Sequence, residues 1–345
     1  MSMASLTLEE IARRAGVSRS TVSRVINNQP NVRDVVRDRV LQVVKETGYH
    51  PNIAARSLAS QRSNVIGLVI PRSVQLFFTD PYFPRLTQGV AEACNRYDYT
   101  LSLFLFHTED DERKLFPRIT RSGMVDGVII QATYASHQLF DQLNSAGVPF
   151  IVAGRPMNDS TSSYVDVDNV SAAIVAVRHL AHQGRKRIAH ISGPLVTTAG
   201  LDRYEGYKQA LAESDLPILP NLFVEGDFTE LSGYYGAQRL LPARPDAIFV
   251  ASDNMAIGAM RAISEAMLKV PADIAIVSFD DLPPASQATP RLSTIRQPIR
   301  RMGIKLVDTL VDIMENGPTP PRRILFGTEL VVRESCGTMK IRELA

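Results

Sequence analysis

The sequence predicts a small all-α helix-turn-helix domain at the N-terminus, followed by an α/β core of two doubly wound lobes. A chain of 345 residues is too long for one ordinary domain. Apolar residues recur with helical spacing over the first part of the chain, whereas from about residue 63 short β-branched runs alternate with longer helical stretches. Hydrophobic residues make up 45% of the chain and charged residues 21%, as in soluble globular proteins.

The first two helices are predicted from their caps and their apolar stripes. Thr7 and Glu10 have the spacing of a capping box, in which the threonine caps the helix and the glutamate bonds back. Gly16 ends the first helix, and Ser18 caps the second. Two short helices joined by a tight glycine-containing turn form a helix-turn-helix. The stripes are Leu8, Ile11, Ala12 and Ala15, and then Val22, Val25 and Ile26.

A third helical stripe closes the small core and ends at Gly48. It consists of Val36, Val40, Leu41, Val43 and Val44. The run TLEEIARRAGVS over residues 7–18, followed by RSTVSRVIN over residues 19–27, resembles the headpiece of LacI/GalR-family repressors. That family often caps its third helix with Ser or Thr, whereas this chain has Arg33 beside Asp34, so Asn31 or Asp34 is the expected cap.

The resemblance implies a sequence-specific DNA-binding transcription regulator, a repressor, whose residues 1–49 bind double-stranded DNA. A recognition helix places its N-terminal residues in the major groove. Arg19 and Arg24 are expected to read bases there, because an arginine pairs bidentately with guanine. Thr21 and Ser23 suit phosphate contacts, although a local helix bond is the alternative for each hydroxyl. The residues expected at the DNA are Thr7, Ser18, Arg19, Ser20, Thr21, Ser23, Arg24 and Asn27.

The charge distribution favours a nucleic-acid partner for the N-terminal part alone. Residues 1–62 carry ten Lys or Arg and five Asp or Glu, whereas the rest of the chain has three more acidic than basic residues. A basic head on a mildly acidic body is typical of a DNA-binding head. Charge alone leaves an ordinary solvated basic surface open as the alternative.

Residues 50–62 resemble the family's hinge segment, with the run YHPNIAARSL over residues 49–58. Asn52 can cap a helix of one or two turns, which is marginal in water and should be ordered only when paired with a second copy on DNA. By resemblance, Leu58 would wedge into the minor groove, and Asn52, Ala55 and Arg56 would also lie at the DNA. Without the family, Leu58 would be an ordinary apolar residue in a linker.

The core over residues 63–345 is expected to bind an effector and to dimerise. Expected strands cover residues 65–70, 100–106, 127–130, 150–153, 187–191, 247–251 and 274–279, and expected helices cover 86–96, 172–183, 203–214 and 255–268. Such alternation implies parallel sheets with helices on both faces. The resemblance implies a periplasmic-binding-protein-like architecture, with an N-lobe over about 63–162 and 293–325 and a C-lobe over about 163–292 and 326–340. The chain would cross between the lobes near residues 162–163, 293–294 and 326–327.

Ligands of open α/β sheets bind beyond the carboxyl ends of the strands, which here means between the lobes. An aspartate and an arginine can bond adjacent hydroxyls while aromatic faces cover a sugar ring, so a sugar or sugar derivative is the expected small-molecule effector. Ser252 and Gly154 stand where sugar-binding relatives often have more polar groups. By motif, the expected contacts are Tyr82, Phe83, Arg203, Phe228, Ser252 and Asp280.

Structural roles are the alternatives for several of these positions. Asp280 could cap the following turn, Phe228 could belong to the core, and Asp253 could cap the next helix. Of the adjacent pair, Asp280 is expected to bind and Asp281 to cap.

Other classes of function fit the sequence less well. A nucleotide-cradling glycine loop, an HExxH motif and a nucleophile elbow are all missing, which argues against an enzyme. His179 and His182 are one turn apart but have no matching cysteine or carboxylate for a metal. We therefore expect no catalytic residue, metal or cofactor. The helix-turn-helix and the lack of an apolar signal segment disfavour a secreted sugar-binding protein.

The expected setting is a cytoplasmic homodimer. The two cysteines, Cys94 and Cys336, are far apart and favour a reducing compartment over a disulfide framework. No apolar run is long enough for a membrane helix. One headpiece covers one half-site, so symmetry implies a homodimer on a pseudo-palindromic operator. Induction is the favoured response to the effector, and a partner protein as corepressor stays open.

Overall fold

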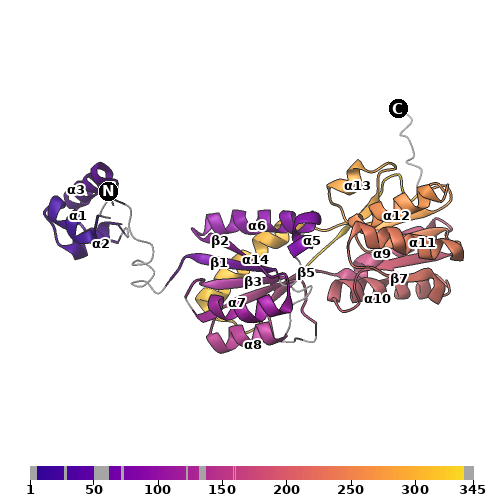
Figure 1. The fold of residues 1–345 in the computed structure, drawn as a ribbon, viewed down its shortest axis with the longest axis horizontal. Coiled ribbons are helices and arrows are strands. Elements are labelled where there is room, and N and C mark those ends of the chain that lie inside the picture. Colours follow the sequence, from indigo (N-terminus) through magenta and orange to yellow (C-terminus); the bar gives the residue numbers. More distant parts are fainter. Residues whose placement is uncertain are drawn as a thin grey trace. The chain divides into compact units, whose positions relative to one another are not determined.

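The structure, a computed structural model, describes residues 6–26, 29–49, 62–70, 74–121, 123–131, 137–157, 159 and 161–337. The chain divides into a small N-terminal unit, Met1–Ser63, and a core, Asn64–Ala345. Figure 1 labels the helices and strands of both. Within the described ranges, no helix is long and apolar enough to cross a membrane.

The N-terminal unit contains the three predicted helices, α1 (Leu8–Ala15), α2 (Arg19–Ile26) and α3 (Asp34–Thr47). The Thr7 hydroxyl caps α1 by accepting a hydrogen bond from the Glu10 amide at 3.3 Å, and Gly16 ends α1 with a φ of 63°. Ile11, Val22 and Val40, one from each helix, are fully buried. Helices this short depend on such packing, because isolated ones are marginal in water.

The Glu10 side chain departs from the capping-box prediction. Its carboxylate accepts hydrogen bonds from the guanidinium groups of Arg13 and Arg14 on the next turn of α1. The hydrogen bond from Arg13, followed by that from Arg14, lowers the pKa of Glu10 to about 2. The two ion pairs take the carboxylate that would otherwise bond back to the cap.

The start of α3 also differs from the prediction. Neither Asn31 nor Asp34 caps it, because Arg33 occupies the cap position without a side-chain hydrogen bond. Leu41, predicted in the apolar stripe, is 47% exposed, since the neighbouring Val40 fills the side of α3 that faces the core.

The first lobe of the core, the N-lobe, is a six-stranded sheet in the order β11-β5-β4-β3-β1-β2, with every pair parallel. Its strands are β1 (Val65–Ile70), β2 (Thr100–Leu105), β3 (Gly127–Gln131), β4 (Phe150–Ala153), β5 (Tyr164–Val167) and β11 (Arg323–Phe326). Its helices are α5 (Val74–Thr79), α6 (Tyr82–Arg96), α7 (Glu109–Arg121), α8 (His137–Ala146) and α14 (Ile299–Asn316). Helices α6 and α14 cover one face of the sheet, and α7 and α8 cover the other (Figure 1).

Helices α6 and α14 approach closely because a glycine stands at their contact on each helix. A Cβ atom at Gly89 would lie 2.0 Å from the Arg300 carbonyl oxygen, and one at Gly303 would lie 2.3 Å from the Leu86 carbonyl oxygen. A larger residue at either position would push the two backbones apart. The contact joins an early segment of the core to a late one.

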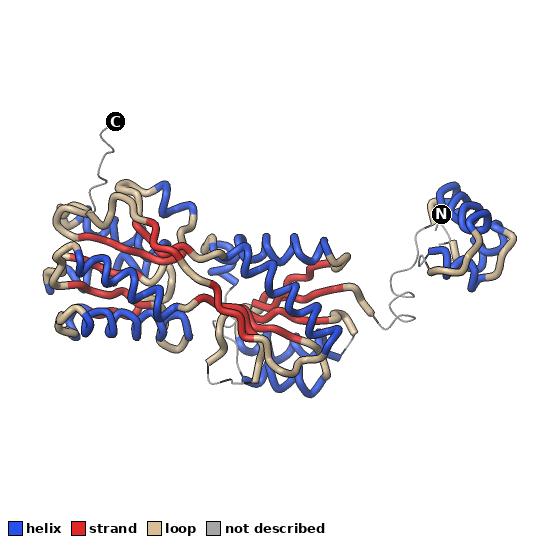
Figure 2. The backbone as a smooth tube through the Cα atoms, turned by 180° about the vertical axis from the view of Figure 1, so that it is seen from behind, coloured by secondary structure: helices blue, strands red, loops and turns tan. Residues whose placement is uncertain are grey.

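The second lobe, the C-lobe, is a six-stranded sheet in the order β12-β10-β9-β8-β6-β7, parallel except for the β10–β12 pair. Its strands are β6 (Ile188–Ser192), β7 (Phe223–Glu225), β8 (Ala247–Val250), β9 (Ala275–Asp280), β10 (Ser293–Arg296) and β12 (Glu329–Val331). Its α-helices are α9 (Asn169–His182), α10 (Thr198–Glu213), α11 (Glu230–Leu240), α12 (Asp253–Glu265) and α13 (Pro283–Gln287). Figure 2 shows both sheets flanked by helices, which confirms the predicted fold class.

The central strand β8 shows why the sequence folds into such layers. Its side chains alternate between faces: Ala247 and Phe249 pack in the cluster that includes α9 and α10, whereas Ile248 and Val250 pack in the cluster that includes α11 and α12. Both faces are therefore dry, which is why the strand is a continuous apolar run.

The predicted crossings between the lobes lie a few residues too early in two places. Strand β5 pairs in the N-lobe sheet, so the first crossing follows Val167 rather than residues 162–163. Strand β10 pairs with β9 in the C-lobe sheet, so the second crossing follows Arg296 rather than residues 293–294. The third crossing lies between β11 and β12, at the predicted residues 326–327. The sheet to which a short strand belongs is determined by the strand with which it pairs, and the local sequence does not show that partner.

Candidate functional site

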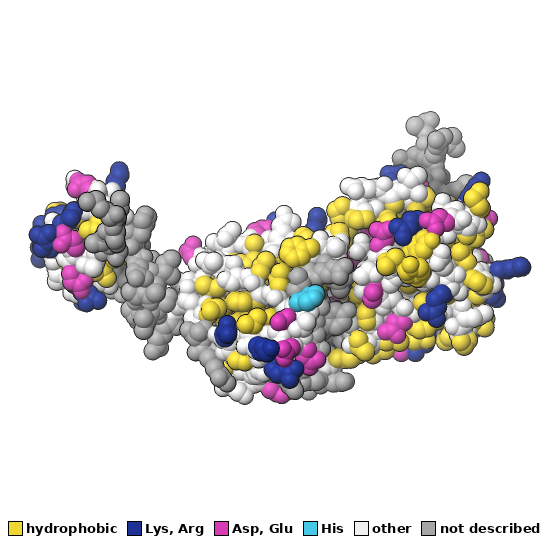
Figure 3. Space-filling view, viewed as in Figure 1, with side chains coloured by type: hydrophobic (Ala, Val, Ile, Leu, Met, Phe, Trp, Pro, Cys, Tyr) yellow, Lys and Arg dark blue, Asp and Glu magenta, His cyan; other side chains and the backbone are white. Residues whose placement is uncertain are grey.

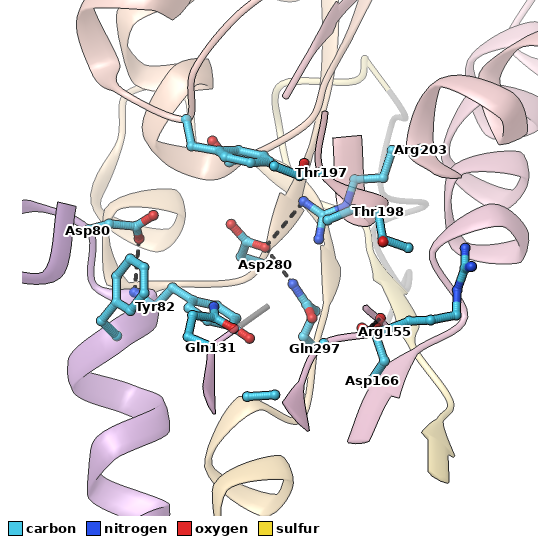
Figure 4. A pocket seen from close by; sticks show the side chains of 16 residues that line it. Asp80, Tyr82, Gln131, Arg155, Asp166, Thr197, Thr198, Arg203, Asp280 and Gln297 are labelled. Atoms are coloured by element: carbon cyan, nitrogen blue, oxygen red, sulfur yellow. Dashed lines mark hydrogen bonds and ion pairs between the residues drawn. The ribbon is translucent and has the colours of Figure 1, made fainter. Parts of the chain in front are cut away.

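A cavity lies between the two lobes of the core, at the carboxyl ends of their parallel strands (Figure 4). Gln131 ends β3, Asp166 lies in β5, and Asp280 ends β9, so the topology brings these polar side chains to one place. The N-lobe contributes Asp80, Tyr82, Phe83, Gln131, Arg155 and Asp166 to the lining. The C-lobe contributes Thr197, Thr198, Arg203, Phe228, Ser252 and Asp280, and Gln297 lines the cavity at the second crossing.

Arg203, on the first turns of α10, is the most firmly held cation in the cavity. The residue is 5% exposed. Its Nε donates a hydrogen bond to Asn169 Oδ1 at 2.9 Å, and its Nη1 donates to the Ala251 carbonyl oxygen. The guanidinium lies 3.7 Å from the centre of the Phe279 ring. These contacts fix the plane of the guanidinium before any ligand arrives.

Asp280 lies beside Arg203 in the lining of the cavity (Figure 4). Its Oδ1 accepts a hydrogen bond from Gln297 Nε2 at 2.6 Å and lies 3.8 Å from Arg203 Nη1. Burial raises the pKa of Asp280 well above its ordinary value, and the charge of Arg203 counters part of that rise. The backbone of Asp280 has a φ of 117°, a conformation that favours glycine. Such strain is held only where surrounding contacts impose it.

Two further carboxylates of the lining belong to the N-lobe. Asp80 is 8% exposed, its Oδ1 accepts from the Tyr82 amide at 2.9 Å, and burial raises its pKa to about 6. Asp166 is 7% exposed and accepts from the amides of Arg155 and Val167, both at 2.7 Å. Burial raises the pKa of Asp166 as well. Neither carboxylate forms an ion pair with a described Lys or Arg.

Aromatic side chains supply the apolar part of the cavity. Tyr82 and Phe83 meet edge to face, with ring centres 5.6 Å apart. Phe228 has a φ of 68° and packs against Gly193, where a Cβ atom would lie 2.1 Å from Phe228 Cζ. Only glycine at position 193 therefore leaves room for this ring.

Arg155 connects the two lobes at the edge of the cavity. It follows β4 of the N-lobe, and its Nη2 donates to both carboxylate oxygens of Asp202 on α10 of the C-lobe, at 2.6 and 2.7 Å. The Arg155 side chain is 42% exposed, so water screens the ion pair and limits its strength.

In the N-terminal unit, the exposed side chains of α2 form a second candidate surface. Arg19, Ser20 and Arg24 are exposed, and Lys and Arg side chains gather on this unit (Figure 3). Arg19 Nη1 forms an ion pair with Glu9 Oε1 at 2.9 Å. The Thr21 hydroxyl lies 2.8 Å from the Ser18 hydroxyl, so it has the local hydrogen bond that was the alternative to a phosphate contact.

Comparison with known proteins identifies the chain. Residues 7–52 match the family described as bacterial regulatory proteins, lacI family, and residues 177–336 match a periplasmic binding protein-like domain. The HTH-type transcriptional regulator CelR of Thermobifida fusca is 36% identical over 333 residues, which cover 95% of this chain and 98% of CelR. This chain belongs to the LacI family of bacterial transcription regulators. The ribose operon repressor of Halalkalibacterium halodurans is 34% identical over 95% of this chain and 96% of its own length.

Solved structures of LacI-family proteins have the same fold over nearly the whole chain. A complex of the transcriptional regulator CelR with cellobiose has a TM-score of 0.77 at 34% identity, covering 96% of this chain and 99% of that one. A Lac repressor dimer bound to operator and the anti-inducer ONPF has a TM-score of 0.85 at 27% identity, with the same coverage.

The structure of this LacI-family chain brings the six predicted effector contacts together. Tyr82, Phe83, Arg203, Phe228, Ser252 and Asp280 all line the one cavity. The Ser252 hydroxyl also caps α12 by accepting from the Met255 amide at 3.2 Å. On α2, Ser23 is half-buried. The predicted DNA contacts Asn27, Asn52, Ala55, Arg56 and Leu58 lie outside the described residues.

Two acidic neighbours of the cavity have structural roles. Asp253 accepts hydrogen bonds from Ser278 and Thr294 and from the Leu282 amide, so it ties α12 to β9 and β10 instead of capping α12. Asp281, predicted to cap, instead forms ion pairs with arginines at positions 296 and 333.

In the histidine pair on α9, His179 has a structural partner as well. His179 hydrogen-bonds with Gln183, its Nε2 lying 2.6 Å from the amide nitrogen. Among the residues that the structure describes, no group of three His, Cys, Asp or Glu could hold a metal ion.

Sequence reasoning missed part of the lining, and for some residues a signal was present. Gln131 directly follows one predicted strand, and Arg155 lies two residues after another. The rule that ligands bind beyond the carboxyl ends of strands would therefore have found both. Asp166 lies in β5, which was not predicted as a strand. The other polar side chains of the lining that were not predicted as contacts are Asp80, Thr197, Thr198 and Gln297.

Proposed function

We propose that this LacI-family regulator is a repressor that binds a pseudo-palindromic operator as a homodimer and responds to a sugar or sugar derivative bound between its lobes. The observation that carries the proposal is the cavity, where buried Arg203 and Asp280 stand opposite Tyr82 and Phe83. Sugar hydroxyls bond to charged side chains of this kind, and the apolar face of a sugar ring stacks on aromatic rings. The cellobiose complex of CelR and the operator-bound Lac repressor dimer support the same assignment.

For DNA binding we assign base reading to Arg19 and Arg24, on the exposed face of α2. Arg19 begins the recognition helix and Arg24 lies in its last turn. This helix enters the major groove in helix-turn-helix proteins. Residues 1–49 would form the DNA-binding part and residues 50–62 the hinge, with a second copy supplying the other half-site. Because a repressor acts on the chromosome, we place the protein in the cytoplasm and assign it no enzymatic activity.

Effector binding would act by changing how the lobes meet. The lining draws on both lobes, so a ligand held by Asp80 and Asp280 together stabilises the closed cavity over an open one. The Arg155–Asp202 ion pair, which crosses between the lobes, would favour the same closed state. The resulting shift of one lobe against its mate would alter pairing of the hinge segments on DNA. Coupling of this kind is typically about 1–3 kcal/mol per site.

The test is fluorescence anisotropy of the full-length protein on labelled DNA from upstream of its own gene, with and without cellobiose, ribose and other neutral sugars. We expect a Kd on the order of 10⁻⁸ M or below at physiological salt. One sugar should weaken this binding about tenfold or more, in line with the coupling above. DNA of the same length and scrambled sequence is the control for non-specific binding.

Two outcomes would contradict the proposal. Equal affinity for native and scrambled DNA, and failure to select any site from random sequence, would remove the repressor assignment. Specific DNA binding that no sugar changes would keep the repressor and remove the sugar, leaving a partner protein as the candidate effector.

A further inference from the structure

The charges of the cavity lining are unbalanced towards the negative. Three aspartates, Asp80, Asp166 and Asp280, line it from three separate segments of the chain, and each is less than a tenth exposed. The lining holds two cations, Arg155 and Arg203, among its described residues. Asp80 belongs to the N-lobe and Asp280 to the C-lobe, and Figure 4 shows both carboxylates among the side chains that line the cavity.

Both arginines are already engaged by groups of the protein. Arg155 is neutralised by Asp202, whose two oxygens lie 2.6 and 2.7 Å from its Nη2. Arg203 donates to Asn169 and to the Ala251 carbonyl oxygen, and its charge faces Asp280 at 3.8 Å. Each described cation of the lining therefore already has a carboxylate of the protein beside it, Asp202 for Arg155 and Asp280 for Arg203.

The N-terminus of α10 also lies at the cavity, and helix N-termini attract anions. One amide of the first turn of α10 already has a partner in the protein, because the Thr197 hydroxyl accepts a hydrogen bond from the Gly200 amide at 3.1 Å. Such a helix end contributes a partial charge, whereas the three carboxylates contribute whole ones when ionised.

We propose that the cavity selects an uncharged glycoside or polyol and rejects phosphorylated and acidic forms of the same sugar. This inference rests on the proposed function and specifies the ligand class of that site. A hydroxyl suits this lining, because it donates to an aspartate and accepts from Arg203 or from the amide groups of Gln131 and Gln297. A phosphate or carboxylate placed there meets buried carboxylates at short range, where the low dielectric strengthens repulsion. Losing its water without gaining a cation adds a further penalty.

The buried carboxylates also respond to a bound anion in a way that opposes its binding. Burial already raises the pKa values of Asp80, Asp166 and Asp280. A nearby negative charge would raise them further, so an anion could enter only together with protons. Rejection is therefore expected to be strongest above neutral pH.

The experiment is isothermal titration calorimetry of the full-length protein with matched ligand sets at pH 8. Each set contains a neutral sugar, its phosphate and its aldonate: cellobiose, glucose and ribose with their charged derivatives. We expect the neutral member of one set to bind and both of its anionic derivatives to bind at least about 100-fold more weakly, as buried like charges imply. An anionic derivative that binds as tightly as its parent sugar, or more tightly, overturns the inference and leaves the proposed function standing.

A variant separates charge from shape, since added groups could be rejected for their size alone. Asp80→Asn keeps an oxygen that can accept from the Tyr82 amide and removes the charge. It should reduce the difference in affinity between neutral and anionic ligand about tenfold, whereas Asp110→Asn, at an exposed position of α7 outside the cavity, should leave that difference unchanged. If Asp80→Asn still binds operator and the affinity difference between neutral and anionic ligand is unchanged, repulsion by the lining carboxylates is not the cause of the selectivity, and the inference is overturned. If no sugar of any charge binds, the proposed sugar effector falls, and this inference falls with it.

Discussion

Charged side chains in the N-terminal unit and in the core cavity are held in opposite ways. Arg19 is 68% exposed at its side chain and shares an ion pair with exposed Glu9, whereas Arg203 is buried and bonded on several sides. The acids differ likewise: ion pairing in water lowers the pKa of Glu10 to about 2, and burial raises that of Asp80 to about 6. Exposed charges keep their hydration and exchange partners easily, while buried ones are fixed in place at a cost.

The difference matches what each surface must recognise. A DNA duplex presents many phosphates, and exposed arginines can adjust to them and release counterions on binding. A small ligand offers few contacts, so its site gains affinity from groups that are already in position. We therefore expect substitutions to have larger and more specific effects in the cavity than on α2.

The largest effect is expected from Arg203→Ala. This change removes a direct contact and leaves Asp280 without its facing cation, so effector affinity should fall at least about 100-fold. Arg203→Lys should lower the effector affinity nearly as much, because an ammonium group cannot reproduce the two hydrogen bonds that the guanidinium donates to Asn169 and Ala251. Titration of the operator-bound protein with the effector measures the loss.

Arg178→Ala is the matched control for Arg203, because Arg178 lies on α9 with an exposed ion pair to Glu213. It should respond to effector like the wild type. A normal effector response in Arg203→Ala would contradict the expected difference between buried and exposed charges, because it would show that the effector does not need Arg203.

The next effect is a pH dependence from Asp80. Its folded pKa of about 6 lies above the ordinary value of 3.8, so the folded state binds the proton more tightly than the unfolded state. This group therefore destabilises the fold above about pH 6, and the penalty fades as the pH falls towards 4. Asp80→Asn should raise the free energy of unfolding by up to about 3 kcal/mol at pH 8 and by about 1 kcal/mol at pH 4.5.

Urea unfolding followed by circular dichroism at both pH values checks the Asp80 prediction. The asparagine keeps an oxygen for the Tyr82 amide, so the substitution tests charge more than shape. A benefit of the same size at both pH values would show that burial of the charge is not the cause.

The smallest effects are expected on the N-terminal unit. Arg19→Ala should weaken operator binding about 10- to 100-fold and relax specificity at one base pair, because a bidentate guanine contact is typically worth about 1–3 kcal/mol. Arg13→Ala, on the solvated side of α1, should lower affinity only slightly and equally for all sequences. Anisotropy on operators with single base changes separates the two. Loss of affinity without loss of specificity in Arg19→Ala would reassign Arg19 to phosphate.

The fold was predictable where local signals and long-range packing agree. The cap at Thr7, the glycine at position 16 and the apolar stripes define α1 and α2, and dry strands such as β8 read as unbroken apolar runs. The lobe crossings were misplaced at β5 and β10, because a four-residue strand belongs to a sheet through a partner distant in sequence. No local pattern in either strand carries that information.

The site was predictable in its outline but not in its electrostatics. Family motifs led to Arg203 and Asp280, and strand ends could have led to Gln131 as well. The sequence does not reveal that Asp202 neutralises Arg155, or that Asn169 orients Arg203, since these pairs form only when separate elements pack. The net charge of the cavity depends on such pairs.

The three crossings between the lobes have a consequence for synthesis on the ribosome. Strands β1 to β5 of the N-lobe emerge first, but their sheet lacks the edge strand β11 and the covering helix α14 until residue 326 has been made. At typical translation rates, the interval between β5 and β11 is on the order of ten to thirty seconds. During that time the apolar face later covered by α14 is open to the cell, so this lobe, although begun first, is the part of the chain most in need of a chaperone.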